Sequence, residues 1–253
     1  SVKFIGQLIA ACVVTFYGGI LLQDISAFGF YIDFGILAYP ITIFFIVACV
    51  NCVNLIDGLD GLAGGISAIY YLTIGIIAAI MGKIGLDVTL TFIMFGATLG
   101  FLVHNFHPAT IFAGDSGSMF MGFMIAVIAL LGFKNVTLTS FIIPLLILAI
   151  PILDTLFAII RRKLKGESFS TPDKSHIHHQ FLNMHLSYRG AVLVIYAIQG
   201  LFAIASIVYV LRDRTLGYII YAVLVIIILF LVLKTDVVFN HKEFEKRFNF
   251  LKK

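Results

Sequence analysis

The sequence predicts an all-α membrane protein, built as one polytopic bundle of helices. Hydrophobic residues make up 61% of its 253 residues and charged residues only 12%, which is far from the composition of a soluble domain. The hydrophobic residues form continuous runs, each long enough or nearly so to cross about 30 Å of hydrocarbon as a helix. A membrane β-barrel is excluded, because its strands are about ten residues of alternating polarity.

Eight hydrophobic runs divide the chain, and we expect each to span the membrane within a single domain of residues 1–253. They are roughly Lys3–Leu22, Ile36–Val53, Leu62–Met81, Val88–Val103, Met119–Phe133, Leu138–Ile160, Ala191–Leu211 and Leu216–Leu233. Gly96-x-x-x-Gly100 in the fourth run predicts close helix packing, since small residues let two backbones approach. We expect the connection Gln23–Asp33 to be a short loop without chemistry.

The basic residues predict the orientation of these spans. With eight spans, the N-terminus, the loops 53–61, 104–118 and 161–190 and the tail 234–253 share one side and hold thirteen Lys and Arg residues, against four on the other side. Because Lys and Arg gather in cytoplasmic loops, we expect both termini in the cytoplasm. The net charge of +4 is then a topology signal and gives no indication of nucleic-acid binding. The tail His241–Lys253 predicts an amphipathic helix on anionic lipid.

The connection between the second and third runs carries two carboxylates, Asp57 and Asp60, each followed by glycine, and an amide at Asn54. A carboxylate at the edge of hydrocarbon is costly unless it is solvated, paired or bound to a cation. This stretch is therefore a candidate functional site.

A second polar stretch, Gly114-Asp115-Ser116-Gly117-Ser118, stands at the entry to the fifth run, in the connection that also holds Asn105 and Phe112. A carboxylate, hydroxyls and free backbone N–H groups at a helix start suit either N-capping or a phosphate and metal site. Taken alone, the stretch favours capping. Asp57 and Asp60 on the same predicted side favour the metal and phosphate interpretation.

A third set follows the sixth run. Asp154 lies about two turns before Arg161 and Arg162 in an apolar helix, so it either faces a wet cavity or pairs with Arg161. Three histidines follow, at positions 176, 178 and 179, and they suit either a transition metal or phosphate oxygens. The basic residues around them favour phosphate. The remaining histidines are interpreted as interfacial or solvated: His104, His107, His185 and His241.

Acidic groups in two short loops and basic groups in a third, all on one membrane face, are typical of phosphoryl transfer with Mg²⁺. A site at the lipid interface indicates a lipid among the substrates. The rival hypothesis is a membrane transporter, which needs ionisable groups near the bilayer midplane. The middles of these runs hold almost none, which favours the enzyme.

Four motifs resemble those of the polyprenyl-phosphate N-acetylhexosamine-1-phosphate transferases, in the same order and over essentially the whole chain. They are Asn54-Leu55-Ile56-Asp57-Gly58-Leu59-Asp60-Gly61-Leu62-Ala63, Gly114-Asp115-Ser116-Gly117-Ser118, Pro151-x-x-Asp154-Thr155 with Arg161-Arg162, and Pro172-Asp173-Lys174-x-His176-x-His178-His179. The resemblance implies transfer of a sugar 1-phosphate from a UDP-sugar to undecaprenyl phosphate, with release of UMP. It also implies Mg²⁺ as the cofactor, with Mn²⁺ as the alternative, and a multi-pass protein of the bacterial plasma membrane, and it allows a homodimer.

The resemblance also implies roles for single residues. Asp115 would be the metal ligand, Phe112 would stack near the uracil, and Asn105 would support the centre. The residues expected to line the nucleotide and diphosphate site are Asn54, Asp57 and Asp60, with Asp154 and His176 as further substrate-binding residues. The cationic residues expected to hold the diphosphate or stabilise departing UMP are Arg161, Arg162, His178 and His179.

The histidine motif favours the branch that uses UDP-N-acetylglucosamine to begin teichoic acid or O-antigen-type polymers. The alternative is the peptidoglycan branch, which acts on a UDP-muramoyl-pentapeptide. The family also carries an adjacent Asp-Asp pair in an earlier cytoplasmic loop, and no Asp-Asp dipeptide occurs here. We therefore expect about three N-terminal spans of the family to be missing, and the 253-residue chain to be inactive by itself.

Overall fold

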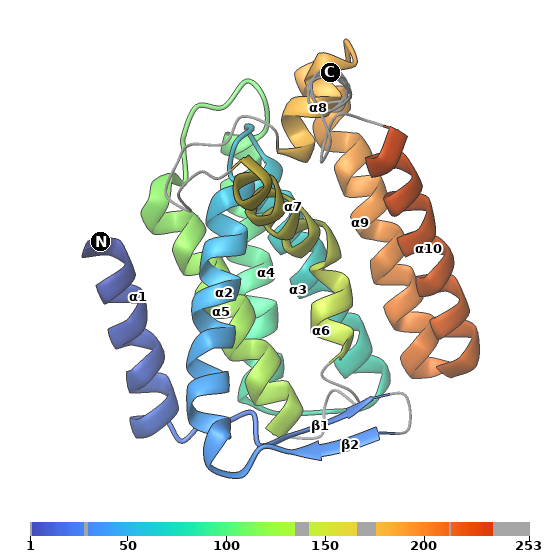
Figure 1. Cartoon of the computed structure of the whole chain (residues 1–253). Helices are drawn as coiled ribbons and strands as arrows, with labels where there is room; N and C mark the ends of the chain where they lie inside the picture. Colours follow the sequence, from blue (N-terminus) through green and yellow to red (C-terminus); the bar gives the residue numbers. More distant parts are fainter. Residues whose placement is uncertain (1, 28–29, 135–141, 166–175, 213, 235–253) are drawn as a thin grey trace, which may run out of the picture.

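The computed structural model describes residues 2–27, 30–134, 142–165, 176–212 and 214–234, and it is a bundle of helices with one small hairpin (Figure 1). The elements are α1 (Val2–Cys12), the π-helical turn η1 (Val13–Tyr17), β1 (Asp24–Ala27), β2 (Phe30–Asp33), the 3-10 turn η2 (Gly35–Leu37), α2 (Ala38–Ile56), α3 (Leu62–Ile80), α4 (Leu86–Asn105), α5 (Gly114–Lys134), α6 (Ile142–Ile147), α7 (Ala149–Lys165), α8 (Ile177–Asn183), α9 (Tyr188–Leu211) and α10 (Arg214–Lys234). The predicted all-α polytopic membrane bundle is confirmed.

Within the described ranges, five helices are long and apolar enough to cross a membrane. They are the stretch Gly35–Ile56, α3, α4, the stretch Gly114–Gly132 and α9. Two shorter apolar helices, Val2–Tyr17 and Thr215–Phe230, correspond to the first and last predicted spans. The first ends before the predicted Leu22, because the chain leaves the helix at Gly18 and Gly19, and Gly19 has a φ of 59°.

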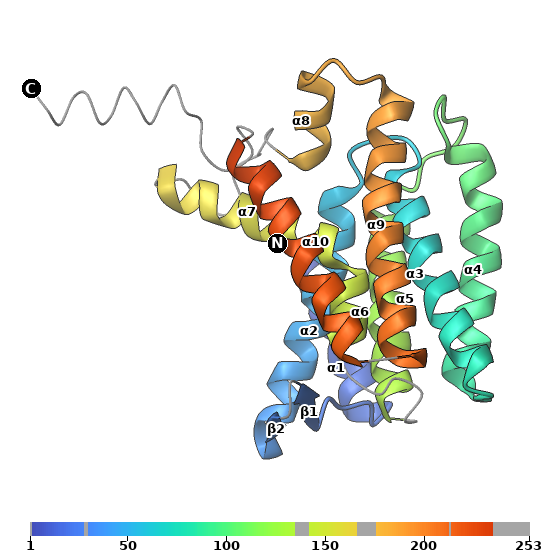
Figure 2. The same ribbon diagram turned by 90° about the vertical axis from the view of Figure 1, so that its right-hand side faces the viewer.

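The sixth predicted span, Leu138–Ile160, is wrong as one continuous helix over the part that the structure describes. The chain forms the short α6 and then α7, which leaves the bundle sideways (Figure 2). Pro151 has no N–H, so it cannot donate to the carbonyl of Ile147, four residues earlier. Gln199 of α9 donates its side-chain N–H to that carbonyl instead. The carbonyl that the break leaves without a helical donor thus finds its hydrogen-bond partner on a neighbouring helix.

The core forms around α3, which packs against α4, α5 and α9. Tyr71 of α3 donates its hydroxyl to the Met121 carbonyl of α5 at 3.0 Å. On the other side of α5, a Cβ added to Gly122 would lie 2.8 Å from the backbone of Val50, so α2 and α5 touch at their backbones. The predicted close packing at Gly96 and Gly100 is wrong for the described residues, where no atom of a neighbouring element lies within 4 Å of a Cβ added at either glycine.

The connection predicted as a plain loop, Gln23–Asp33, is a two-stranded antiparallel hairpin, with Asp24 paired to Asp33 and Ala27 to Phe30. The hairpin lies at one end of the bundle, and the loops after α2 and α4 and helix α8 lie at the other (Figure 1). The polar candidate residues therefore belong to the end opposite the hairpin.

Candidate active site

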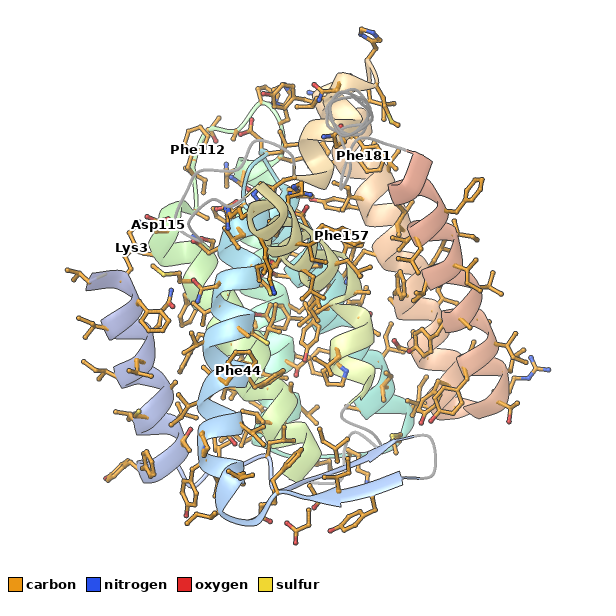
Figure 3. The ribbon with its side chains drawn as sticks, viewed as in Figure 1. Lys3, Phe44, Phe112, Asp115, Phe157 and Phe181 are labelled. Carbon is orange, nitrogen blue, oxygen red and sulfur yellow. The ribbon has the colours of Figure 1, made fainter. Side chains whose placement is uncertain are left out.

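Asp115, in the first turn of α5, is the centre of a small polar cluster. Its carboxylate accepts hydrogen bonds from Lys3 of α1 and, at 3.2 Å, from the Asn54 side-chain N–H of α2. Lys3 and Asp115 point toward one another across the gap between α1 and α5 (Figure 3). These two donors pair the carboxylate of Asp115 where it stands at the entry to the apolar helix α5.

Two further contacts fix the partners of Asp115. Asn51 of α2 donates its side-chain N–H to the Gln7 side-chain oxygen at 2.8 Å, which holds α1 against α2 one turn below Lys3. Asn54 also donates to the Ser118 hydroxyl at 2.8 Å. The cluster is therefore tied to three helices, α1, α2 and α5, and its geometry follows from how they pack.

Asp57 is the C-terminal cap residue of α2, directly after Ile56, and it is half-buried. Burial, together with the negative charge of Asp115, raises the pKa of Asp57 from 3.8 to about 6. The two carboxylates thus lie close enough to disfavour each other's charge. A bound cation would relieve that repulsion.

Asp60 belongs to a different cluster. One oxygen of its carboxylate lies 2.9 Å from Nδ1 of His107 and accepts the Ala109 backbone N–H at 3.2 Å. The His107 ring stacks on Tyr188, with ring centroids 5.2 Å apart, and Arg189 donates to the His107 carbonyl at 2.9 Å. His107 was predicted as an interfacial or solvated side chain, and 37% of it is exposed, but its ring is also held by Asp60 and Tyr188.

Asn105 connects the loop after α2 to the loop after α4. Its side chain is buried, accepts the Gly61 N–H at 3.0 Å and donates to the Ile111 carbonyl at 2.9 Å. Tyr196 of α9 donates its hydroxyl to the Gly61 carbonyl. A Cβ on Gly65 would overlap the Tyr196 ring, so this glycine allows α9 to approach α3.

Phe112 is 74% exposed in the loop before α5, where Figure 3 shows its ring pointing outward. Its place in the loop that leads to Asp115 is consistent with stacking on a planar ligand near the carboxylate cluster.

Asp154 and His176 form a buried pair, with Oδ2 and Nδ1 2.8 Å apart and both residues under one-tenth exposed. Asp154, predicted either to face a wet cavity or to pair with Arg161, thus has a partner at the N-terminal cap of α8. Arg161 is also buried, and Nε of Arg162 is buried without a hydrogen-bond partner among the described residues.

Part of the predicted histidine motif lies outside the described residues. Residues 166–175, which include Pro172, Asp173 and Lys174, are not described, and neither are the side chains of His178 and His179 in the first turn of α8. The predicted amphipathic tail also lies outside the described residues, which end at 234. The proposed phosphate contacts of these two histidines stay predictions.

The donor set of the carboxylate cluster fits Mg²⁺. Over the described part of the chain, no three or more His, Cys, Asp or Glu side chains come together in a group that could hold a metal ion. Mg²⁺ does not need one, since it binds through one or two carboxylates and takes its other oxygens from water and substrate phosphates. Asp115 and Asp57 supply two mutually repelling carboxylates, and Asn54 adds amide oxygen.

Comparison with known proteins decides the family. Residues 1–133 match the family described as glycosyl transferase family 4, which is more than half of the chain. The chain belongs to this family. It is a multi-pass membrane member, because its apolar helices form the bundle described above.

Individual relatives support the same family assignment. Over 232 residues the chain is 43% identical to the "probable undecaprenyl-phosphate N-acetylglucosaminyl 1-phosphate transferase" of Bacillus subtilis (strain 168), covering 90% of this chain and 63% of the relative. It is 35% identical to the decaprenyl-phosphate N-acetylglucosaminephosphotransferase of Mycolicibacterium smegmatis, over 81% of this chain and 56% of the relative. It is also 35% identical to the phospho-N-acetylmuramoyl-pentapeptide-transferase of Halalkalibacterium halodurans, over 81% and 62%. The chain thus spans less than two-thirds of the length of these relatives.

The structure adds residues to the site that the motifs do not indicate. Lys3 is only one basic residue among many in the sequence, although its place at the edge of the first run, on the side of Asp115, is a signal. His107, Tyr188, Arg189 and Tyr196 carry no such signal, because they meet their partners across loops and helices far apart in the chain.

Proposed function

We propose that this protein transfers N-acetylglucosamine 1-phosphate from UDP-N-acetylglucosamine to undecaprenyl phosphate and releases UMP. The observation that carries the proposal is the cluster of Asp57 and Asp115 with Lys3 and Asn54 on one membrane face. The names of the Bacillus subtilis and mycobacterial relatives support the N-acetylglucosamine 1-phosphate donor and a polyprenyl phosphate acceptor. The product would begin a teichoic acid or related cell-envelope polymer.

In this reaction an oxygen of the lipid phosphate attacks the phosphorus attached to the sugar, and the bond from that phosphorus to UMP breaks. Asp115 and Asp57 would hold Mg²⁺, which supplies positive charge to the phosphate oxygens when bound. Lys3 offers a further cation beside Asp115. Arg161 and Arg162 follow Asp154 by about two turns in α7, and they would neutralise diphosphate oxygens.

Phe112 would stack on the uracil, because an exposed aromatic ring gives a planar base a surface to pack on. Asn105 would keep the loop that carries Phe112 in place against Gly61. We propose that this end of the bundle faces the cytoplasm, since it includes the more basic of the two sets of connections.

The test is UMP release by the protein as its whole reading frame encodes it, with UDP-N-acetylglucosamine, undecaprenyl phosphate and Mg²⁺. Asp115→Asn is expected to lower turnover by about a hundredfold or more, because it removes a charge that acts at the phosphoryl centre. Asp33→Asn, in the hairpin at the opposite end, is the matched control and should keep wild-type turnover.

Unchanged turnover in Asp115→Asn would remove this residue from the chemistry. Release of UMP from UDP-muramoyl-pentapeptide, with none from UDP-N-acetylglucosamine, would move the protein to the peptidoglycan branch.

A further inference from the structure

The structure assigns Asp60 a positioning role: through His107 it holds the loop 106–113, which presents Phe112, and it does not itself touch the metal or the reacting phosphates. This inference rests on the proposed function for the identity of the nucleotide. Its geometry rests on contacts of Asp60 that lie apart from the Asp115 cluster.

The first argument is separation. Asp115 is held by residues of α1 and α2, whereas the partners of Asp60 belong to the loop after α4 and, through His107, to the start of α9. α1 and α9 lie on opposite sides of the bundle (Figure 1). The two aspartates of the same short motif therefore face different neighbours.

The second argument is that two donors share one oxygen of Asp60. Nδ1 of His107 and the Ala109 N–H both lie on Oδ2, at 2.9 and 3.2 Å. Both come from the loop 106–113, so one carboxylate holds that loop at two points. Hydrogen bonds to a charged acceptor are stronger than those between neutral groups.

The third argument is that His107 is held from other sides as well. Its ring stacks on Tyr188 at an interplanar angle of 18°, and its carbonyl accepts from Arg189. The Ser187 hydroxyl caps α9 by accepting the Gly190 N–H at 3.1 Å, which fixes the turn that bears both residues. His107 thus joins Asp60, from the loop after α2, to a well-formed helix start.

The far end of the loop is closed as well. The Thr110 N–H donates to the His104 carbonyl at 2.8 Å, and Asn105 holds the Ile111 carbonyl. Phe112 follows directly, with its ring exposed on a fixed base. A ring that is already in place loses less entropy when a base stacks on it, so nucleotide affinity should depend on the link between Asp60 and this loop.

The sequence contains no tryptophan, so Phe112→Trp provides a single fluorescent reporter in the loop. UMP is titrated against this reporter protein and against the same protein carrying Asp60→Ala, Asp60→Asn, His107→Phe or His107→Asn. We expect Asp60→Ala and His107→Phe each to weaken UMP binding about tenfold, which corresponds to about 1.4 kcal/mol. The double variant Asp60→Ala/His107→Phe should be little weaker than either single one, because both break the same link.

The conservative variants separate positioning from chemistry. Asp60→Asn keeps an oxygen that accepts from His107 and Ala109, so its UMP affinity should stay within about threefold of the reporter protein. His107→Asn keeps a donor and should recover part of what His107→Phe loses. A loss in Asp60→Asn as large as in Asp60→Ala would overturn the inference, because the charge itself would then act on the ligand.

Hydrogen–deuterium exchange without ligand tests the loop independently of the nucleotide. The Thr110 and Ile111 amides should exchange faster in Asp60→Ala and His107→Phe, return to the rate of the reporter protein in Asp60→Asn, and leave the amides of α3 unchanged. Unchanged exchange in both disruptive variants would also overturn the inference. A Phe112→Trp reporter protein that shows no response to millimolar UMP, with the exchange pattern as expected, would instead count against the proposed function.

Discussion

Asp57 and Asp115 show how two residues of one type acquire opposite properties from their neighbours. Asp115 is half-exposed and accepts hydrogen bonds from Lys3 and Asn54. Asp57 is more buried and feels the charge of Asp115, so its pKa rises to about 6. One carboxylate already has hydrogen-bond donors, and the charge of the other would be stabilised by a bound cation, which is the balance that a metal site needs.

This balance predicts a pH dependence of stability for the metal-free protein. The folded-state pKa of Asp57 lies above its usual 3.8, so charging it penalises the folded state progressively as pH rises from about 4 to above 6. In EDTA, Asp57→Asn should therefore be more stable than the parent at pH 7.5, by about 1 kcal/mol after allowance for solvent screening, and equally stable at pH 4. Thermal unfolding followed by circular dichroism measures this difference.

Mg²⁺ supplies the control for that experiment. At pH 7.5 it should stabilise the parent and leave Asp57→Asn nearly unchanged, since only the parent then binds the cation with both carboxylates. A stability difference that is the same at pH 4 and pH 7.5 would contradict the assigned cause.

At the scale of elements, the break between α6 and α7 decides where the polar residues of α7 lie. Pro151 orphans the carbonyl of Ile147, and an unpaired carbonyl inside a membrane bundle costs free energy unless a neighbouring helix satisfies it. Gln199, fully buried in α9, donates to it. α7 can then leave the bundle and bring Asp154 to His176.

The break predicts a paired effect of two substitutions. Gln199→Leu should destabilise the protein by about 1–2 kcal/mol, because it leaves the Ile147 carbonyl unpaired. The side-chain oxygen of Gln199 has no hydrogen-bond partner among the described residues, so removing that oxygen breaks no hydrogen bond. The expected loss of stability therefore lies toward the low end of this range. In a Pro151→Ala background, the backbone N–H at position 151 can donate to the Ile147 carbonyl. Gln199→Leu should then lower the free energy of unfolding by clearly less.

Thermal unfolding of the four proteins in detergent gives this double-mutant cycle. Ile204→Leu, on an exposed part of α9, is the control for a general effect of substituting this helix. If Gln199→Leu costs the same with proline and with alanine at position 151, the proposed link between the two residues fails.

At the scale of the whole molecule, sidedness is the dominant feature. The hairpin and the turn at Ile84 lie at one end, and the carboxylate cluster, Phe112 and α8 lie at the other (Figures 1 and 3). A site built at one end of a bundle lets a water-soluble nucleotide and a membrane lipid meet without either crossing the bilayer. The orientation of that end is therefore central to the proposed function.

Cysteine labelling tests the orientation. In a background with Cys12, Cys49 and Cys52 changed to alanine, single cysteines replace Ile84 and Phe112, which are 99% and 74% exposed. With the site in the cytoplasm, a membrane-impermeant maleimide should label Ile84→Cys in intact protoplasts and Phe112→Cys only after permeabilisation. The reverse pattern would contradict the positive-inside assignment.

The sequence by itself determined the class of the protein, most of its apolar helices and the residues of its acidic loops. Continuous hydrophobicity identifies a helix in lipid, because every backbone polar group must be satisfied within the segment. A carboxylate at the edge of such a run is costly enough to indicate function without knowledge of its neighbours. Asp57 and Asp60 are indicated in this way, and the structure brings Asp57 close enough to Asp115 for the charge of Asp115 to raise its pKa.

The partners of these residues were decided only by the tertiary structure. Asp60 meets His107 47 positions later, Lys3 meets Asp115 across 112, and Gln199 reaches a carbonyl 52 positions earlier. No local periodicity encodes such contacts, because they depend on which helix faces which and on where a proline interrupts a helix. Asp57 and Asp60 look equivalent in the sequence, and packing alone places one beside the carboxylate cluster and the other against the loop that carries Phe112.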